Sequence, residues 1–218
     1  MTQGVALFDF DDTIASGDSI LPFLKYCIKK GAAPKSQMLK AAVAFIYWKL
    51  RPSKISRAKS WTLSFLKGKT VDEMADLSRA FFREEYLSHI YEDARNELWA
   101  LRSQGMKIVI VSASPDVYMH VLPEFIPVDA VLATCCETDD NGKYTGKVGV
   151  NCKGAEKVRR IEKYLKASGF VLDMKCSAAY GDSPSDADMM SLVNRAVLVN
   201  PKKKLLQRRP DGIVVHWH

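Results

Sequence analysis

The sequence predicts an α/β fold in which a parallel sheet wrapped by helices carries an inserted all-helical domain, and three observations support this. Residues 5–8 form an apolar run without alternation, which is typical of a strand buried on both faces of a parallel sheet. From Lys107 onward, apolar runs alternate with helical patterns, as in successive βαβ units. The stretch between these two regions shows only helical periodicity, and it is far longer than an ordinary connection.

The first strand, residues 4–10, runs into the acidic turn Asp9-Phe10-Asp11-Asp12-Thr13. Open α/β sheets bind ligands beyond the carboxyl ends of their strands, which is where these carboxylates fall. Carboxylates this close together repel one another unless a cation neutralises them, and an oxygen-only ligand set suits Mg²⁺. An acidic turn without a function explains the same residues. Both interpretations remain open at this point, and we favour the functional one.

Residues 19–101 are predicted to be helical, because apolar positions recur at helical spacing in four segments separated by glycine and proline. A further helix over 91–103 ends at Gly105, which suits a C-cap. An insertion directly after the acidic strand end would lie over the ligand crevice. We therefore expect residues 17–100 to form a helical cap, and residues 1–16 and 101–218 to form the core.

The core elements follow in chain order from Lys107. Apolar runs predict the strands, helical periodicity predicts the crossover helices, and the Asp140-Asn141-Gly142 turn predicts a small hairpin. We expect strands at 107–112, 130–133, 176–180, 196–199 and 213–217, helices at 116–124, 154–168 and 185–193, and the hairpin at 137–148.

At 218 residues with 47% hydrophobic and 26% charged residues, the chain has the composition of a globular protein. Its 5 cysteines are odd in number and lack a C-x-x-C spacing, so we expect reduced thiols rather than disulfides or a zinc site. The first strand begins too early to leave room for a signal peptide, and no apolar stretch is long enough to span a bilayer. We therefore expect a cytoplasmic protein.

The net charge of +7 is unevenly distributed. Residues 19–71 contain no Asp or Glu but 12 Lys and Arg, and a second basic cluster lies at 202–209. Such asymmetry is typical of proteins that bind an anionic substrate or surface, although solvated helix faces explain it equally well.

Within this basic stretch, residues 38–50 combine aromatic and apolar positions with Lys40, Lys49 and the adjacent Arg51. Such a helix can lie in a membrane interface, or it can be the packed core of a small helical cap, which we favour. Peripheral attachment to an anionic membrane surface, at the inner face, is therefore an alternative. We expect no nucleic-acid partner, because the strands lack interleaved aromatic and basic residues.

Several strand and helix ends are expected to meet at one crevice. Asp9 and Asp11 leave the first strand, Ser112 leaves the second, a lysine begins the helix after the hairpin, and Asp182 and Asp186 leave a later strand. An aspartate can attack phosphorus, and a second carboxylate two residues on can act as general acid and base. A hydroxyl, a lysine and Mg²⁺ can hold the phosphoryl oxygens. This set favours phosphoryl transfer over a non-catalytic anion-binding protein.

These segments together resemble the four ordered motifs of the haloacid dehalogenase superfamily of phosphatases, and they span the core from Val5 to Val199. The motifs are the acidic turn, Ser112, the lysine and Gly181-Asp182-Ser183-Pro184-Ser185-Asp186. The resemblance implies a Rossmann-like three-layer core with a helical cap of the first type. It also implies a phosphomonoester hydrolase that forms an aspartyl-phosphate.

The resemblance further implies a role for each motif residue. Asp9 is the expected nucleophile and Asp11 the general acid/base; Ser112, Ala113 and the lysine bind phosphate; Mg²⁺ is held by Asp9, the main-chain carbonyl of Asp11 and Asp182, with Asp186 in support.

Two lysines, Lys153 and Lys157, lie near the start of the relevant helix. Related phosphatases have an apolar position four residues after the lysine. Ile161 meets this pattern for Lys157, whereas Lys157 itself stands four residues after Lys153. We choose Lys157.

Within the superfamily the sequence is most similar to the phosphoserine phosphatase-like subfamily, one branch of which dephosphorylates phosphatidylglycerophosphate. Phosphoserine phosphatase itself has Glu where Asp18 stands, and its carboxylate-binding arginine would fall near Trp61 or Thr62, neither of which replaces a guanidinium. Asp18 is our candidate for substrate specificity. We expect a small phosphorylated metabolite as substrate, with a phospholipid headgroup and then phosphoserine as alternatives.

Overall fold

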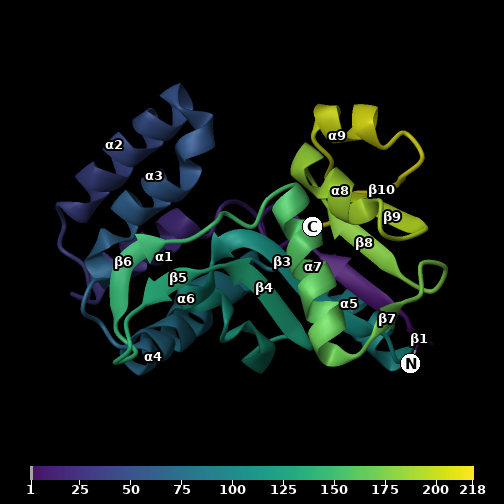
Figure 1. Ribbon diagram of the computed structural model, residues 1–218, viewed down its shortest axis with the longest axis horizontal. Helices are drawn as coiled ribbons and strands as arrows, with labels where there is room; N and C mark the ends of the chain where they lie inside the picture. The colour runs from purple at the N-terminus through teal and green to yellow at the C-terminus, as the bar shows by residue number, and fades with distance from the viewer. Residues whose placement is uncertain (1) are drawn as a thin grey trace.

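The computed structural model describes residues 2–218, and a six-stranded parallel sheet forms its centre (Figure 1). The predicted α/β class and the inserted helices are confirmed. The predicted first strand, β2 (Val5–Phe8), lies in the interior of the sheet, where it pairs with β3 on one side and β8 on the other. The strand order is β10 (Ile213–Val215), β9 (Arg195–Val199), β8 (Ala178–Gly181), β2, β3 (Lys107–Pro115) and β4 (Ala130–Thr134).

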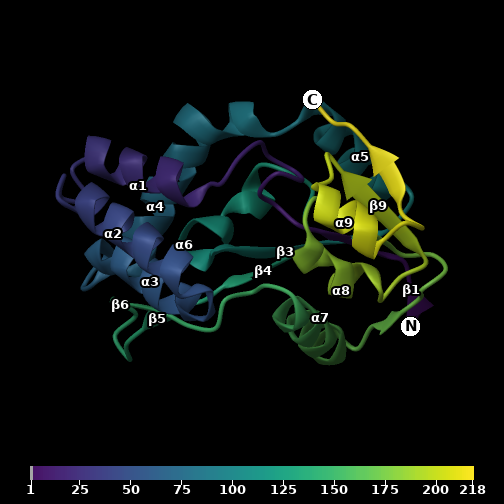
Figure 2. The ribbon, with the colours of Figure 1, turned by 90° about the horizontal axis from the view of Figure 1, so that it is seen from above.

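Helices cover both faces of this sheet (Figure 2). Ala6 and Phe8 face the side covered by α5 (Glu92–Ser103), where Leu98 and Leu101 are buried. Val5 and Leu7 face the opposite side, covered by α7 (Ala155–Ser168) and the short α8 (Ala187–Met190). Because β2 is buried on both faces, it needs an apolar side chain at every position, which explains its unbroken apolar run.

The inserted helices lie between β2 and α5 and form the lobe at the left of Figure 1. The antiparallel hairpin of β5 (Cys136–Thr138) and β6 (Tyr144–Val148) packs against this lobe, through the bond from the Gly68 amide to the Tyr144 carbonyl. We propose that the inserted helices form a cap on a core made of the sheet and its covering helices. α5 belongs to the core, because it packs on β3. The elements of the lobe are α1 (Ile20–Lys29), α2 (Gln37–Leu50), η1 (Pro52–Lys54), α3 (Ile55–Thr62), η2 (Ser64–Leu66), α4 (Val71–Phe81), η3 (Phe82–Tyr86) and η4 (Leu87–His89).

One expectation for the cap is wrong. The large apolar side chains of α2 do not form its packed core; the buried residues of this helix are Gln37, Ala41 and Ala44. Small side chains face inward because α2 lies close against α3, which leaves no room for larger ones. Five large apolar side chains of α2 are exposed instead: Leu39, Val43, Phe45, Ile46 and Leu50.

Several local boundaries also differ from the sequence prediction. The helix expected at 116–124 is α6 (Asp116–Met119) followed by the 3-10 turn η5 (Leu122–Glu124), because Pro123 has no amide hydrogen to continue an α-helix. The helix expected at 185–193 is the 3-10 turn η6 (Pro184–Asp186) followed by α8. The sequence prediction also missed α9 (Lys203–Arg208) and the two-residue pairing of β1 (Thr2–Gln3) with β7 (Val171–Leu172). Within residues 2–218, no helix has the length and apolar character needed to cross a bilayer.

Candidate active site

Asp9 directly follows β2, and the sheet fixes its position. Its amide donates to the Tyr180 carbonyl of the neighbouring strand β8 over 3.0 Å. The carboxylate is buried, with 8% of the residue exposed. Burial raises the pKa of Asp9, and the Asp186 and Asp182 carboxylates add to this rise, while the Lys157 ammonium opposes it.

Lys157 lies on the first turn of α7 and is fully buried. Its Nζ donates to Asp9 Oδ1 and to Asp186 Oδ1, each over 2.7 Å. Burial alone would lower the pKa of Lys157, but the Asp186 and Asp9 carboxylates outweigh burial and raise it. Lys153, the other lysine considered, is exposed. The ammonium that reaches Asp9 therefore belongs to Lys157.

Asp186 is held in place from two sides. Its Oδ2 accepts bonds from the amide of Ser183 over 3.0 Å and from the Ser183 hydroxyl over 2.8 Å, which completes a capping box at η6. A side-chain carbon at Gly181 would lie 2.6 Å from Asp186 Cβ. Glycine at position 181 therefore allows Asp186 to fold back over the end of β8, toward Lys157.

Asp182 ends the same strand, and its partner was not expected from the sequence. Lys202 Nζ donates to Asp182 Oδ2 over 2.5 Å and to Asp12 Oδ2 over 3.0 Å. Burial raises the pKa of Asp182, and Lys202 opposes the increase. Asp12 itself has a φ of 59°, a left-handed conformation that Asp tolerates better than most residues, and its Oδ1 accepts the Gly17 amide over 2.9 Å. Asp12 therefore shapes the turn into the cap and anchors Lys202.

The buried carboxylates form a cluster that fits a divalent cation. Oxygen atoms of Asp9, Asp182 and Asp186 lie within 4.8 Å of one another. All the donors are oxygens, which matches the preference of Mg²⁺. Lys157, paired with Asp9 and Asp186, and Lys202, paired with Asp182, compensate part of this negative charge.

Asp11 belongs to a separate network that points toward the cap. Its Oδ1 accepts the Ser19 amide over 3.0 Å, and its Oδ2 accepts the hydroxyl of Ser114. The Ser19 hydroxyl in turn bonds to Ser114 Oγ over 3.0 Å and to the Tyr118 hydroxyl over 2.8 Å. Burial, with the nearby Asp18 carboxylate, raises the pKa of Asp11 to about 6, against the opposing effect of the Ser114 and Ser19 bonds. A carboxyl group with such a pKa can donate and accept a proton near neutrality.

Ser112 and Ala113, the expected phosphate-binding residues, lie on β3 beside the acidic turn. The Ser112 hydroxyl accepts the Ser114 amide over 3.0 Å and has no other hydrogen-bond partner within residues 2–218, so it can donate its own hydrogen to a ligand. The carbonyl of Ala113 accepts Thr134 Oγ1 over 2.6 Å and Lys59 Nζ over 2.5 Å.

Lys59, on α3 of the cap, is the second residue that sequence reasoning missed. Its Nζ also donates to Asn151 Oδ1 over 2.7 Å. In the described part of the chain no carboxylate forms an ion pair with it. Burial lowers the pKa of Lys59 to about 8, although the carboxylates of Asp18 and Asp11 oppose the decrease. A partly desolvated cation with only neutral acceptors at the crevice is ready to bind an anion.

Asp18, the candidate specificity residue, is exposed at the start of α1. Its Oδ1 accepts the Ile20 amide over 3.0 Å. The carboxylate lies close enough to Asp11 and Lys59 to influence the pKa of both. Asp18 therefore binds the first amide of α1 and also contributes negative charge near the crevice.

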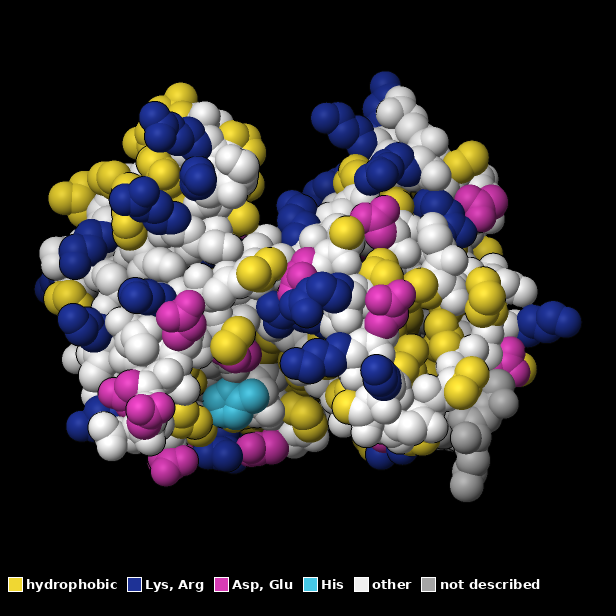
Figure 3. All heavy atoms as spheres, in the orientation of Figure 1, with side chains coloured by type: hydrophobic (Ala, Val, Ile, Leu, Met, Phe, Trp, Pro, Cys, Tyr) yellow, Lys and Arg dark blue, Asp and Glu magenta, His cyan; other side chains and the backbone are white. Residues whose placement is uncertain are grey.

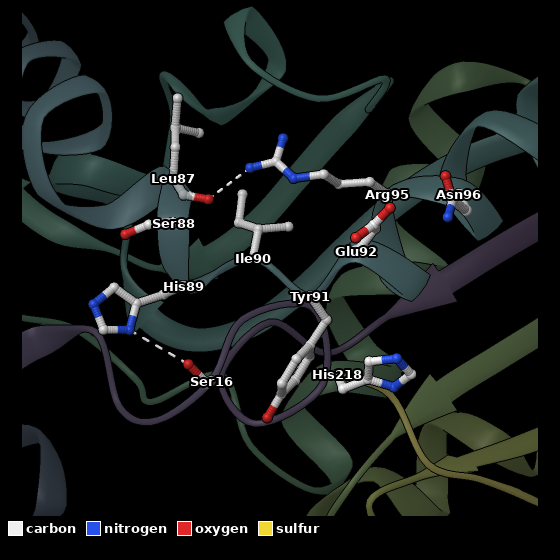
Figure 4. A pocket seen from close by; sticks show the side chains of 10 residues that line it. All are labelled: Ser16, Leu87, Ser88, His89, Ile90, Tyr91, Glu92, Arg95, Asn96 and His218. Carbon is white, nitrogen blue, oxygen red and sulfur yellow. Dashed lines mark hydrogen bonds between the residues drawn. The ribbon is translucent and has the colours of Figure 1, made fainter.

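A cavity of about 640 Å³ lies beside the two chain segments that join cap and core (Figure 4). Its lining includes Ser16 and His89, whose side chains bond over 3.3 Å, and Arg95, which donates to the Leu87 carbonyl over 2.6 Å. The Ser16 amide also donates to the His89 carbonyl over 2.8 Å. The lining contains none of the motif residues. This cavity therefore lies at the junction of cap and core rather than at the reaction site.

Known proteins share both the sequence pattern and the fold. The family model described as haloacid dehalogenase-like hydrolase matches residues 6–191. The protein CicA of Caulobacter vibrioides (strain NA1000 / CB15N) is 30% identical over 188 residues, which is 86% of this chain and 82% of that protein. Other relatives carry the names of phosphatases, among them the histidinol-phosphatase of Neisseria meningitidis serogroup C, 24% identical over 93% of each chain.

The fold recurs in solved structures. A protein of unknown function from Bordetella pertussis Tohama I superimposes with a TM-score of 0.87 at 22% identity, covering 99% of each chain. A substrate-bound phosphoserine phosphatase superimposes with a TM-score of 0.66 at 20% identity, covering 98% of this chain and 93% of that one. At these identities the likeness concerns the fold.

Proposed function

The chain belongs to the haloacid dehalogenase-like hydrolase family, and from this premise we propose that it is a Mg²⁺-dependent phosphomonoester hydrolase acting on a small phosphorylated metabolite. One observation carries the proposal. The buried Asp9 carboxylate lies 2.7 Å from the Lys157 ammonium and within 4.8 Å of the Asp182 and Asp186 oxygens. A nucleophile, a phosphate-binding cation and a metal-binding cluster thus meet at one point.

Asp9 is the proposed nucleophile. Lys157 holds Oδ1, whereas no residue in 2–218 forms a hydrogen bond with Oδ2. Oδ2 is thus the oxygen that attacks phosphorus; the phosphorus–oxygen bond to the leaving alcohol breaks as the aspartyl-phosphate forms. Lys157 and the Ser112 hydroxyl bind the phosphoryl oxygens whose negative charge grows in the transition state.

Asp11 is the proposed general acid/base. With a pKa raised to about 6 it carries a proton in part of the molecules near neutrality and gives it to the leaving oxygen. As a carboxylate it then takes a proton from the water that hydrolyses the aspartyl-phosphate. Ser114 and the Ser19 amide orient the carboxyl group for both steps.

Asp9, Asp182 and the main-chain carbonyl of Asp11 are the proposed Mg²⁺ ligands, with Asp186 in support. When bound, the ion neutralises charge on the transferring phosphoryl group. Burial raises the pKa of Asp182, and the Lys202 ammonium opposes this rise from the edge of the cluster.

We propose that Lys59 and Asp18 contact the leaving-group part of the substrate. Both residues belong to the cap and lie near the crevice. Lys59 provides a cation that can bind a second anionic group of the substrate, besides the phosphate. Phosphoserine is a weaker candidate as substrate. Within the described residues, no arginine of the cap forms a hydrogen bond or ion pair with Lys59, Asp18 or their partners at the crevice. A phospholipid headgroup is the stronger alternative, favoured by the exposed apolar side chains of α2.

Phosphate release from p-nitrophenyl phosphate, with and without Mg²⁺, tests the proposal. We expect Mg²⁺-dependent turnover by the wild type and a loss of about 10³-fold or more in Asp9→Asn. Absence of turnover in the wild type would favour the non-catalytic anion-binding alternative, whereas full turnover in Asp9→Asn would exclude Asp9 as the nucleophile.

A further inference from the structure

The outer surface of α2 has an unusual arrangement of side chains. The exposed fractions are 70% for Leu39, 50% for Val43, 53% for Phe45, 59% for Ile46 and 77% for Leu50. The same helix buries two alanines and a glutamine. A helix of a globular protein normally places its large apolar side chains inward. We call these five exposed residues the α2 face.

Basic side chains surround the α2 face. Lys49 Nζ lies 5.3 Å from the Phe45 ring centre and 5.1 Å from that of Trp48, while Arg57 lies 5.5 Å from the Trp61 ring. No carboxylate of residues 2–218 forms an ion pair with Lys40, Lys49, Arg51, Lys54 or Arg57. The stretch 19–71 has no Asp or Glu, so a carboxylate partner would have to come from another segment of the chain. Figure 3 shows the outer end of this lobe covered by hydrophobic and basic side chains.

We propose that the α2 face docks onto an anionic lipid bilayer, with its apolar side chains in the interface and the basic side chains at the headgroups. The proposal is independent of the hydrolytic activity. An amphipathic segment of this kind binds through buried apolar area and attraction to anionic lipids together. The aliphatic stems of Lys40 and Lys49 allow their ammonium groups to stay at the headgroups while the helix lies deeper.

Other occupants match the surface less well. A second copy of the chain would bring two uncompensated basic surfaces together, and like charges across an interface oppose association. A nucleic acid would satisfy the charge but would not bury Phe45 and Ile46 in an apolar medium. An anionic bilayer satisfies both the charge and the apolar side chains.

The α2 face is connected to the crevice through α3. α2 packs on α3, and α3 carries Lys59 to the Ala113 carbonyl and to Asn151. Only one helix therefore separates the proposed lipid surface from the cap residue that reaches the site. A second basic cluster lies on α9, where Lys203 and Lys204 are exposed. This helix is at the outer end of the core, on the side away from the cap (Figure 3).

Sedimentation with lipid vesicles tests the proposal on the full chain. We expect binding to vesicles of equal parts phosphatidylglycerol and phosphatidylcholine, no binding to phosphatidylcholine alone, and weaker binding as salt increases. Phe45→Ser with Ile46→Ser should weaken binding about tenfold or more, since it removes apolar area from the interface. Lys40→Gln with Lys49→Gln should weaken it about 30-fold, since it removes two attractive charges.

Matched substitutions elsewhere separate docking from general effects. Trp99 is 63% exposed on α5, and Trp99→Ser should leave binding unchanged. Lys163→Gln with Lys166→Gln should also leave it unchanged, because these exposed lysines lie on α7 of the core and not on the cap. Circular dichroism confirms that each variant folds.

Three outcomes would overturn the proposal. The first is no binding of the wild type to phosphatidylglycerol vesicles at low salt. The second is binding that the α2 substitutions and the control substitutions reduce equally. The third is a dimer in sedimentation velocity that Phe45→Ser with Ile46→Ser converts to a monomer, which would assign the α2 face to a second copy.

Discussion

A buried lysine of the core and the exposed lysines beside the α2 face of the cap differ in how their charges are compensated. In the core, the fully buried Lys157 shares its ammonium between Asp9 and Asp186 at 2.7 Å. In the cap, Lys40 and Lys49 lie at the surface and form no ion pair within residues 2–218. Internal pairing fixes a charge in one geometry for chemistry, whereas an unpaired surface charge is available to an external anion. The predictions below test this contrast, from the largest expected effect to the smallest.

Lys157→Met should have the largest effect. It leaves the buried carboxylates of Asp9 and Asp186 without their shared cation, and breaking a buried ion pair from one side costs about 3–5 kcal/mol. We expect a decrease of this size in the free energy of unfolding measured by urea titration, together with loss of phosphatase activity.

Lys153→Met is the matched control, because Lys153 is exposed on the same helix start. It should leave the urea midpoint and the activity unchanged. If Lys153→Met were the more damaging of the two, both the proposed role of Lys157 and the contrast between buried and surface charge would be wrong.

Lys59 lies between the two regions, and its substitution should separate function from stability. Lys59→Met should lower kcat/KM about tenfold for a substrate with a second anionic group, since it removes a charged hydrogen-bond donor. It should not lower the thermal midpoint, because the wild type holds this ammonium against neutral acceptors only. Lys54→Met, an exposed neighbour in η1, is the control and should change neither quantity.

The pH profile gives an independent measure of Lys59. Its pKa is lowered to about 8, so the ammonium is charged below that pH and loses its charge as the pH rises through it. We expect kcat/KM for the dianionic substrate to decrease above pH 8 in the wild type but not in Lys59→Met. The free energy of unfolding should change in the opposite direction and increase as the pH rises above 8. The folded protein holds a disfavoured charge below pH 8, and this cost disappears as the pH rises toward the ordinary lysine pKa.

Lys202 provides a smaller test, since its side chain is 57% exposed and its ion pairs are screened. Lys202→Met removes the ammonium from Asp182 Oδ2, so we expect Mg²⁺ to bind up to about fivefold more tightly in calorimetric titrations. Lys203→Met, exposed one residue further on, should leave the affinity unchanged. Weaker Mg²⁺ binding in Lys202→Met would show that Lys202 supports the cluster instead of competing for it.

The smallest effect concerns only the folding of the cap. Thr70 Oγ1 accepts the Glu73 amide at the start of α4 over 3.1 Å, and losing such a cap costs about 1 kcal/mol. Thr70→Ala should lower the thermal midpoint by about 2–4 °C without changing turnover on p-nitrophenyl phosphate. Ser36→Ala is the control, because Ser36 forms no side-chain cap on α2. A change in turnover would mean that cap stability limits catalysis.

Sequence reasoning was most successful where a local pattern has a direct structural cause. The apolar run of β2 predicted a strand buried on both faces, and the acidic turn predicted carboxylates at its end, because strand direction alone determines which edge they occupy. The pattern around Lys157 predicted a lysine followed by the core residue Ile161. Both are buried on α7.

Sequence reasoning was least successful where side chains from distant segments meet. Lys59 and Asn151 are 92 positions apart, and Lys202 and Asp12 are 190 apart, so no periodicity or spacing links them. The apolar positions of α2 were interpreted as a packed core, because periodicity indicates that a helix has an apolar face but not what covers it.

Local sequence patterns were enough to predict the order of most elements, the inserted helices and the identity of the residues at the strand ends, because these depend on local backbone preferences and on side-chain periodicity. Three features became visible only in the folded protein: Lys202 joins the acidic cluster, Lys59 enters the crevice from the cap, and the large apolar side chains of α2 remain in solvent. Those properties depend on distances between segments far apart in the chain and on the volume available where helices meet, and neither is encoded at any single position.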